Sequence, residues 1–184
     1  LGKNFKGKAS KKSAYVNYEL PLKILNYLIK INKKKLKIIF FGTFLEDEKI
    51  TSRINIDYKN NKINLRNKIQ AMSKKNEFEF VWLKLPIIYG EDQVNKNFTS
   101  MLINNIKINK TIKIHNKFNT LYLLNIYDVF KLVLLIKRKW KLYKNRIIVP
   151  KAEGPFFIFE LINKLIKKTK LNIKVVYENK KKRK

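Results

Sequence analysis

Cysteine is absent from this sequence, and His115 is the single histidine among its 184 residues. Without thiols the chain can form no disulfide framework, no thiolate nucleophile and no thiolate metal site. One imidazole alone cannot assemble a zinc centre, so we expect no metal. No apolar run approaches the ~20 residues that span a bilayer, and no signal peptide is visible. We therefore expect a cytoplasmic chain with no membrane partner.

Acidic residues are scarce as well: 13 Asp+Glu stand against 43 Lys+Arg, which gives a net charge of +30. Such an excess is typical of proteins that bind nucleic acid or an anionic surface. Nearly all of it is lysine, accompanied by abundant asparagine, isoleucine, phenylalanine and tyrosine, the residues with A/T-rich codons. Selection for phosphate binding would enrich arginine too. We attribute the charge to coding bias, expect no specific nucleic-acid partner, and keep a basic nucleic-acid-binding module as the alternative.

Apolar residues, at 45%, are numerous enough for one domain with a real core. Their helical spacing predicts helices over 15–31, 58–74, 98–108, 126–137 and 157–168. Short apolar runs predict strands over 36–41, 78–85, 112–114, 121–124, 146–149 and 172–177. The polar segment 46–53 is predicted to be a loop. This alternation indicates an α/β fold with a parallel sheet covered on both faces.

Tyr58 and Lys62 stand four positions apart in the predicted helix 58–74, so their side chains share one helix face. An ammonium beside a phenol favours the phenolate and lowers the pKa of the tyrosine, which suggests a proton-transfer pair. In a lysine-rich chain the spacing also arises by accident. Its surroundings add weight: the predicted strand 36–41 runs out through Gly42 to Thr43, and the next strand runs into the turn Pro86–Gly90. Ligands of open α/β sheets bind outside such strand ends.

These residues resemble the extended short-chain dehydrogenase/reductase family, the NAD-dependent nucleotide-sugar epimerases and dehydratases. The family pattern is a serine or threonine at a strand end, a Tyr-x-x-x-Lys helix, and a strand that enters an Arg-Pro-x-x-x-Tyr-Gly turn. The matches are Thr43, the pair Tyr58 and Lys62, and Pro86 with Tyr89-Gly90. The resemblance covers nearly the whole chain. Within it, Asn17–Leu25 is most similar to the reductases that make CDP-dideoxyhexoses for polysaccharide biosynthesis.

The resemblance implies an enzyme and assigns roles to these residues. Tyr58 would exchange a proton with a sugar hydroxyl or carbonyl, Lys62 would lower the phenol pKa and hold the nicotinamide ribose, and Thr43 would hydrogen-bond the substrate oxygen. Hydride would pass between the sugar carbon and NAD or NADP. Cofactor contacts are implied for Asn17, Lys62, Pro86 and Ile88. Substrate contacts with the nucleotide sugar are implied for Thr43 and Tyr89.

The implied architecture is a partial Rossmann-like doubly wound parallel sheet with a small C-terminal substrate-binding lobe. The dinucleotide-binding domain would comprise 1–93 and 123–151, and the lobe 94–122 and 152–184. Family members commonly form homodimers through the Tyr-x-x-x-Lys helix and the helix before it.

The sequence also departs from the family pattern. Its five glycines are dispersed and form no Gly-x-x-Gly-x-x-Gly phosphate loop. We therefore expect an N-terminally truncated chain that lacks the first βαβ units and binds cofactor poorly. Lys84 stands where the family has arginine, and Leu121–Leu123 replaces an Arg-Asp-Phe whose arginine contacts the nucleotide diphosphate.

Structural interpretations stay open for each of these residues. Tyr58 and Lys62 are otherwise surface residues of a solvated helix, and Thr43 a hydroxyl that satisfies local backbone. Asn17 is otherwise a polar helix residue, and Tyr89 a packing residue. A non-catalytic relative that keeps only the fold is a further alternative.

Overall fold

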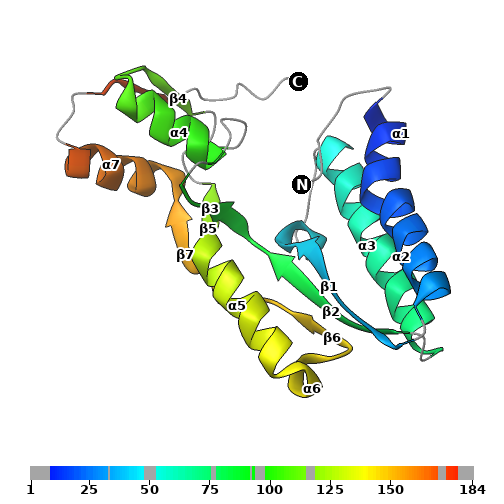
Figure 1. Ribbon diagram of the computed structural model, residues 1–184. Coiled ribbons are helices and arrows are strands. Elements are labelled where there is room, and N and C mark those ends of the chain that lie inside the picture. Colours follow the sequence, from blue (N-terminus) through cyan, green and yellow to red (C-terminus); the bar gives the residue numbers. More distant parts are fainter. Residues whose placement is uncertain are drawn as a thin grey trace. The chain divides into compact units, whose positions relative to one another are not determined.

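The computed structural model describes residues 9–32, 34–47, 53–75, 78–91, 93, 98–114, 119–169 and 173–177. His115 lies outside these ranges. Helices alternate with strands along the chain (Figure 1), which confirms the predicted α/β class. The chain divides into two units, Leu1–Pro86 with Lys131–Pro150 and Ile87–Phe130 with Lys151–Lys184. The assignment of a cofactor domain and a substrate lobe, with the boundaries given above, stays a prediction.

The first unit is built on a parallel sheet of three strands in the order β1-β2-β6. These are β1 (Leu36–Thr43), β2 (Phe78–Leu85) and β6 (Arg146–Ile148). The central strand β2 is buried along its whole length, which explains its near-continuous apolar sequence. β1 pairs with β2 from Leu36 opposite Phe78 to Thr43 opposite Leu85. The carboxyl ends of the two strands therefore lie side by side.

Helices pack on both faces of β2, as the alternation of its side chains requires. On one face lie Phe78, Phe80 and Trp82, which form a core with residues of α2 (Leu20–Ile31) and α3 (Arg53–Ser73). The helical members of this core are Leu25, Leu65 and Ile69. On the other face, Glu79 bonds to Trp140 of the short helix α6 (Trp140–Tyr143).

Two helices begin earlier than predicted. The helix predicted over 15–31 consists of α1 (Ala9–Ala14), a π-helical segment (Tyr15–Glu19) and α2. α3 begins at Arg53, so Tyr58 does not lie in its first turn as expected. The residues before Tyr58 are mostly polar and gave no apolar period from which the start could be read.

The described residues of the second unit form two small sheets and two complete helices. One sheet has the order β3-β5-β7, with β3 (Ile87–Tyr89) parallel and β7 (Glu153–Phe157) antiparallel to β5 (Thr120–Asn125). The other pairs β4 (Ile112–Ile114) with β8 (Val175–Tyr177) in parallel. Helices α4 (Phe98–Lys107) and α7 (Ile158–Thr169) contribute to its core. α5 (Ile126–Arg138) continues from this unit into the first.

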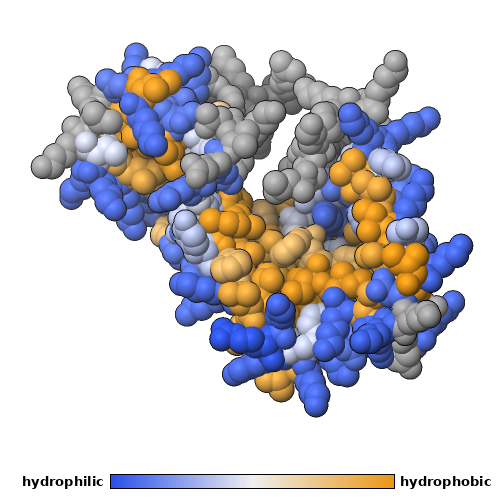
Figure 2. Space-filling model, viewed as in Figure 1, coloured by the Kyte–Doolittle hydropathy of each residue, from blue (hydrophilic) through white to orange (hydrophobic). Residues whose placement is uncertain are grey.

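Figure 2 shows hydrophobic side chains gathered over the sheet of the first unit. Phe41 of β1 and Ile147 of β6 are among the exposed large apolar residues. Of the helices that the structure describes, none has the length and apolar character needed to cross a bilayer.

Candidate active site

The three residues predicted to be catalytic come together at the carboxyl end of β1. Thr43 is the last residue of this strand, and its side chain hydrogen-bonds to that of Tyr58 on α3. One turn further along α3, the Lys62 Nζ atom lies 5.9 Å from the centre of the Tyr58 ring. The same Nζ donates a hydrogen bond to the Phe41 carbonyl at 3.1 Å. A hydroxyl, a phenol and an ammonium therefore meet where the strand ends.

Burial dominates the electrostatics of this group. It raises the pKa of the Tyr58 phenol, the hydrogen bond to Thr43 opposes this, and the negative charge of Glu46 raises it further. Burial lowers the pKa of Lys62, against the opposing effect of Glu46. The pKa of the phenol is thus shifted upward, opposite to the lowering that the Tyr-Lys spacing suggested, because burial and the Glu46 charge outweigh the hydrogen bond with Thr43. At neutral pH the Tyr58 phenol is therefore protonated.

A buried carboxylate beneath Thr43 was not predicted. Residues Phe44–Glu46 form a 3₁₀ turn in which Thr43 and Glu46 make a capping box. The Thr43 amide donates to Glu46 Oε1 at 3.0 Å, and the Thr43 hydroxyl accepts from the Leu45 amide at 3.4 Å. The spacing Thr-x-x-Glu was the sequence signal for this turn, but the segment from residue 46 onward was interpreted as a polar loop.

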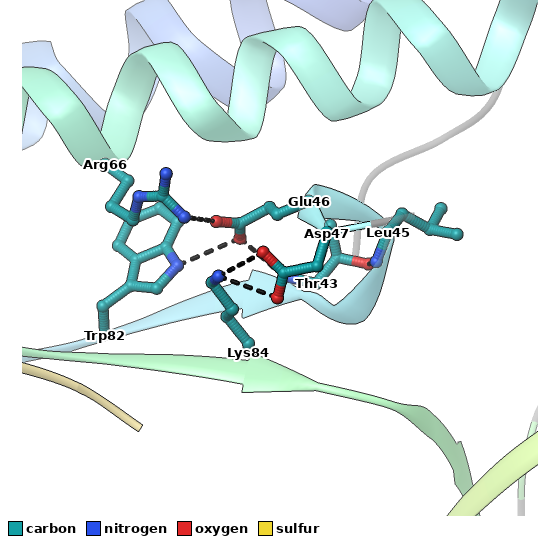
Figure 3. Close-up of polar contacts among 7 residues, drawn as sticks. All are labelled: Thr43, Leu45, Glu46, Asp47, Arg66, Trp82 and Lys84. Atoms are coloured by element: carbon teal, nitrogen blue, oxygen red, sulfur yellow. Dashed lines mark hydrogen bonds and ion pairs between the residues drawn. The ribbon is translucent and has the colours of Figure 1, made fainter. Parts of the chain in front are cut away.

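Glu46 also bonds to the neighbouring strand and helix. Its Oε1 accepts from the indole nitrogen of Trp82 on β2 at 3.0 Å, and its Oε2 pairs with Arg66 on α3 (Figure 3). The side chain of Glu46 is 0% exposed. We call Thr43, Glu46, Arg66 and Trp82 the Glu46 cluster.

Gly42 makes room for this cluster. A Cβ atom at this position would overlap the Glu46 carboxylate and the Trp82 indole, with Trp82 Cε2 only 2.7 Å away. Since real Cβ atoms do not approach so closely, a side chain here would displace one of the two groups.

The cation that replaces the family arginine is already paired within the chain. Lys84, near the end of β2, is buried, and its Nζ donates to both carboxylate oxygens of Asp47 at 2.7 and 2.9 Å. Asp47 directly follows the Glu46 turn and is itself 63% exposed. This pair therefore joins the turn to β2 (Figure 3).

Asn17, predicted to contact the cofactor, is buried in the π-helical segment. Its Nδ2 donates to the backbone carbonyl and to the hydroxyl of Ser13, at 3.0 and 3.3 Å. The Asn17 amide nitrogen thus bonds inside the helix, and this segment packs against α3. The geometry favours the structural interpretation of Asn17, while its cofactor contact stays a prediction.

The other predicted contacts follow β2. Pro86 comes directly after Leu85, which pairs with Thr43. Ile88 and Tyr89 lie on β3 in the second unit, where Ile88 accepts a hydrogen bond from Gln93 and the Tyr89 hydroxyl donates to Glu153 at 3.3 Å. Their predicted roles toward cofactor and substrate stay predictions.

Solved structures with a matching fold include a UDP-glucuronic acid 4-epimerase from Bacillus cereus in complex with UDP-glucuronic acid and NAD. The TM-score is 0.82 at 18% sequence identity, over 97% of this chain and 59% of that one. A UDP-glucose 4-epimerase from Thermotoga maritima, with UDP-glucose, matches with a TM-score of 0.78 and 17% identity over 96% and 60% of the chains. RMD from Pseudomonas aeruginosa, complexed with NADPH, gives 0.80 and 12% over 97% and 68%.

At these identities the likeness concerns the fold. It confirms the predicted fold, a partial Rossmann-like α/β sheet, and this chain spans 59–68% of the length of the three structures. Neither the protein-family models nor the curated proteins provide a match.

Proposed function

We propose that this chain is part of an NAD(P)-dependent enzyme that epimerises, dehydrates or reduces a nucleotide-linked sugar. The observation that carries the proposal is the convergence of Thr43, Tyr58 and Lys62 at the carboxyl end of β1. It is supported by the fold, which the chain shares with epimerases whose structures hold NAD and UDP-sugars. The similarity of Asn17–Leu25 to CDP-dideoxyhexose reductases makes these the subgroup we propose.

The chemistry of this site is a proton transfer at one sugar oxygen. Tyr58, neutral because burial raises its pKa, would donate its proton to a carbonyl oxygen as the carbon is reduced, and recover it from the hydroxyl in the reverse direction. Thr43, already bonded to the phenol, would bind the same oxygen. Lys62 would stabilise the phenolate that remains. A bound nicotinamide would supply or accept the hydride.

The nicotinamide half of the cofactor fits these residues, since Lys62 offers an ammonium beside the phenol. The pyrophosphate half has no Gly-rich loop in this sequence, whose five glycines are dispersed. We therefore expect little or no affinity for NAD or NADP from this chain by itself. Isothermal titration calorimetry measures this, and tight binding would contradict the expectation.

The catalytic role is tested in a chimera that places a Gly-rich βα dinucleotide-binding unit ahead of this chain. We expect Tyr58→Phe to lower turnover of nucleotide sugars about 10²–10⁴-fold and to leave the dissociation constant of NAD nearly unchanged. Tyr127→Phe, at an exposed tyrosine of α5, is the matched control and should have no effect. Equal activity of the two variants would refute the role of Tyr58.

The same assay separates the alternative of a basic nucleic-acid-binding module. That alternative rests on the net charge of +30. It predicts binding to nucleic acid that weakens steeply with salt and does not respond to Tyr58→Phe. A chimera that binds nucleic acid in this way and turns over no sugar would favour it.

A homodimer through α3 and the preceding helix is also part of the proposal. Ile24, Tyr27 and Ile31 of α2 expose apolar side chains that such an interface would cover. Sedimentation equilibrium tests this, with Ile24→Lys expected to weaken self-association.

A further inference from the structure

Glu46 contacts both elements that carry the predicted catalytic residues. It accepts the backbone N–H of Thr43 at the end of β1, at 3.0 Å, and it pairs with Arg66 on α3. Arg66 lies one turn beyond Lys62 on this helix. The single carboxylate thus ties Thr43 and the Tyr58–Lys62 face of α3 together.

A buried ion pair is not expected to stabilise the contact between two elements better than apolar packing does. Removing a carboxylate and a guanidinium from water is expensive, and apolar side chains of similar volume often serve as well or better. Moreover, the Arg66 Nε atom is buried and has no hydrogen-bond partner within the part of the chain that the structure describes. The pair therefore calls for a role beyond packing.

The charge of Glu46 reaches the site. Its negative charge raises the pKa of Tyr58 and of Lys62. Two other charged groups lie by the turn, Lys84 of β2 and Asp47, which directly follows Glu46, and they are paired with one another. Among the charged groups described around the turn, Glu46 with its partner Arg66 is thus placed to determine the electrostatic potential at Tyr58 and Lys62.

We propose that Glu46 is a positioning residue, which fixes Thr43 against α3 and supplies the negative charge in which Tyr58 and Lys62 work. That these two residues are catalytic rests on the function proposed above. The geometry of Glu46 and its effect on the two side chains do not.

The test compares Glu46→Gln with wild type in this chain, without cofactor or substrate. The phenol of Tyr58 is titrated by NMR with ¹³C-labelled tyrosine and assigned with Tyr58→Phe. The amine of Lys62 is titrated by trace acetylation over a pH series and peptide mass spectrometry. Circular dichroism at each pH confirms that the chain is folded.

The two titrations distinguish a charge effect from a structural one. Loss of the Glu46 charge should move the midpoints of both Tyr58 and Lys62 to lower pH, because the charge raises both. Mere loosening would relieve burial, which raises the pKa of Tyr58 and lowers that of Lys62, so the two midpoints would move in opposite directions. Opposite or absent shifts overturn the proposal.

Glu79→Gln is the matched control. Glu79 is a second buried carboxylate of the first unit, and it also bonds to an indole and to a cation, Trp140 and Lys144. We expect its removal to leave both midpoints unchanged. Equal shifts in the two variants would show a nonspecific response and overturn the proposal.

If Glu46→Gln fails to fold, the double variant Glu46→Gln/Arg66→Met removes both charges and leaves none unpaired. It is expected to shift both midpoints downward, but by less than Glu46→Gln, because loss of the Arg66 charge opposes loss of the Glu46 charge. Neither titration requires cofactor. If these shifts are observed but the chimera is inactive, the positioning role of Glu46 stands and the proposed function is refuted.

Discussion

The Glu46 cluster and its counterpart around Glu79 are built from the same chemistry in different surroundings. In both, a carboxylate accepts from a tryptophan indole and pairs with a cation. Glu46 is 0% exposed and pairs with Arg66, whereas the Glu79 side chain is 12% exposed and pairs with Lys144, itself 44% exposed. The first adjoins the predicted catalytic residues, while the second lies near the start of β2.

The difference shows how solvent decides what an ion pair contributes. The lysine of the Glu79 pair keeps much of its hydration. Forming this pair therefore costs little desolvation free energy, and the pair stabilises the fold only modestly. The Glu46 pair has lost most of its hydration, since Arg66 is 16% and Glu46 0% exposed, so either partner left alone is a largely buried, uncompensated charge. We therefore expect substitution of one member to lower the free energy of unfolding more for the Glu46–Arg66 pair than for the Glu79–Lys144 pair.

Arg66→Ala should produce the largest loss of stability. It leaves Glu46 charged and unpaired in the interior, and we expect the free energy of unfolding to fall by about 3–5 kcal/mol. Urea denaturation followed by tryptophan fluorescence measures this. A loss no larger than that of Lys144→Ala would break the comparison.

Gly42→Ala should destabilise the same cluster without changing its charges. The added methyl group would displace the Glu46 carboxylate or the Trp82 indole, and overpacking of this kind costs about 1–3 kcal/mol. The same denaturation experiment tests it. Stability equal to wild type would show that Trp82 and Glu46 can separate freely.

Lys144→Ala should have the smallest direct effect, about 0–1 kcal/mol, because its amine is well exposed. Urea denaturation near neutral pH measures the change. A loss approaching that of Arg66→Ala would mean that exposure does not decide the strength of the two pairs.

The stability that the Glu79 pair contributes should depend on pH. Hydrogen bonds from Lys144 and Trp140 lower the pKa of Glu79 in the folded chain. Its stabilising contribution is therefore present above the pKa of the unfolded chain and lost as the pH falls through the lower folded value. Denaturation at a series of acidic pH values should show a smaller loss of stability in Glu79→Gln than in wild type. Identical curves would contradict this.

The sequence predicted well those parts whose signal is local. β2 was predicted over its full extent, Phe78–Leu85, since burial on both faces makes it a continuous apolar run ended by Pro86. β7 was missed because Gly154 and Pro155 lie within it, residues that argue against a strand. The π-helical segment Tyr15–Glu19 was predicted as part of an ordinary helix, because no apolar pattern in the sequence distinguishes it.

In the site, Thr43, Tyr58 and Lys62 were found from spacing and resemblance, and their convergence is now described. Glu46 was missed because its meaning depends on Arg66 and Trp82, which lie 20 and 36 residues away along the chain. Only the short-range capping box was visible in the sequence. The upward direction of the Tyr58 pKa was also missed, since burial cannot be read from a motif.

The strand order β1-β2-β6 has a consequence for handling this protein. Among the described strands, β1 pairs only with β2, so along its outer side the backbone groups bond to no strand. Near its carboxyl end the Phe41 carbonyl and the Thr43 amide bond to the side chains of Lys62 and Glu46 instead. Such an edge is a template on which further strands can add, and charged residues on it are a common safeguard against aggregation. Exposed Lys37 is such a residue on β1. Replacing it with valine should make the protein aggregate faster at high concentration, which turbidity measures.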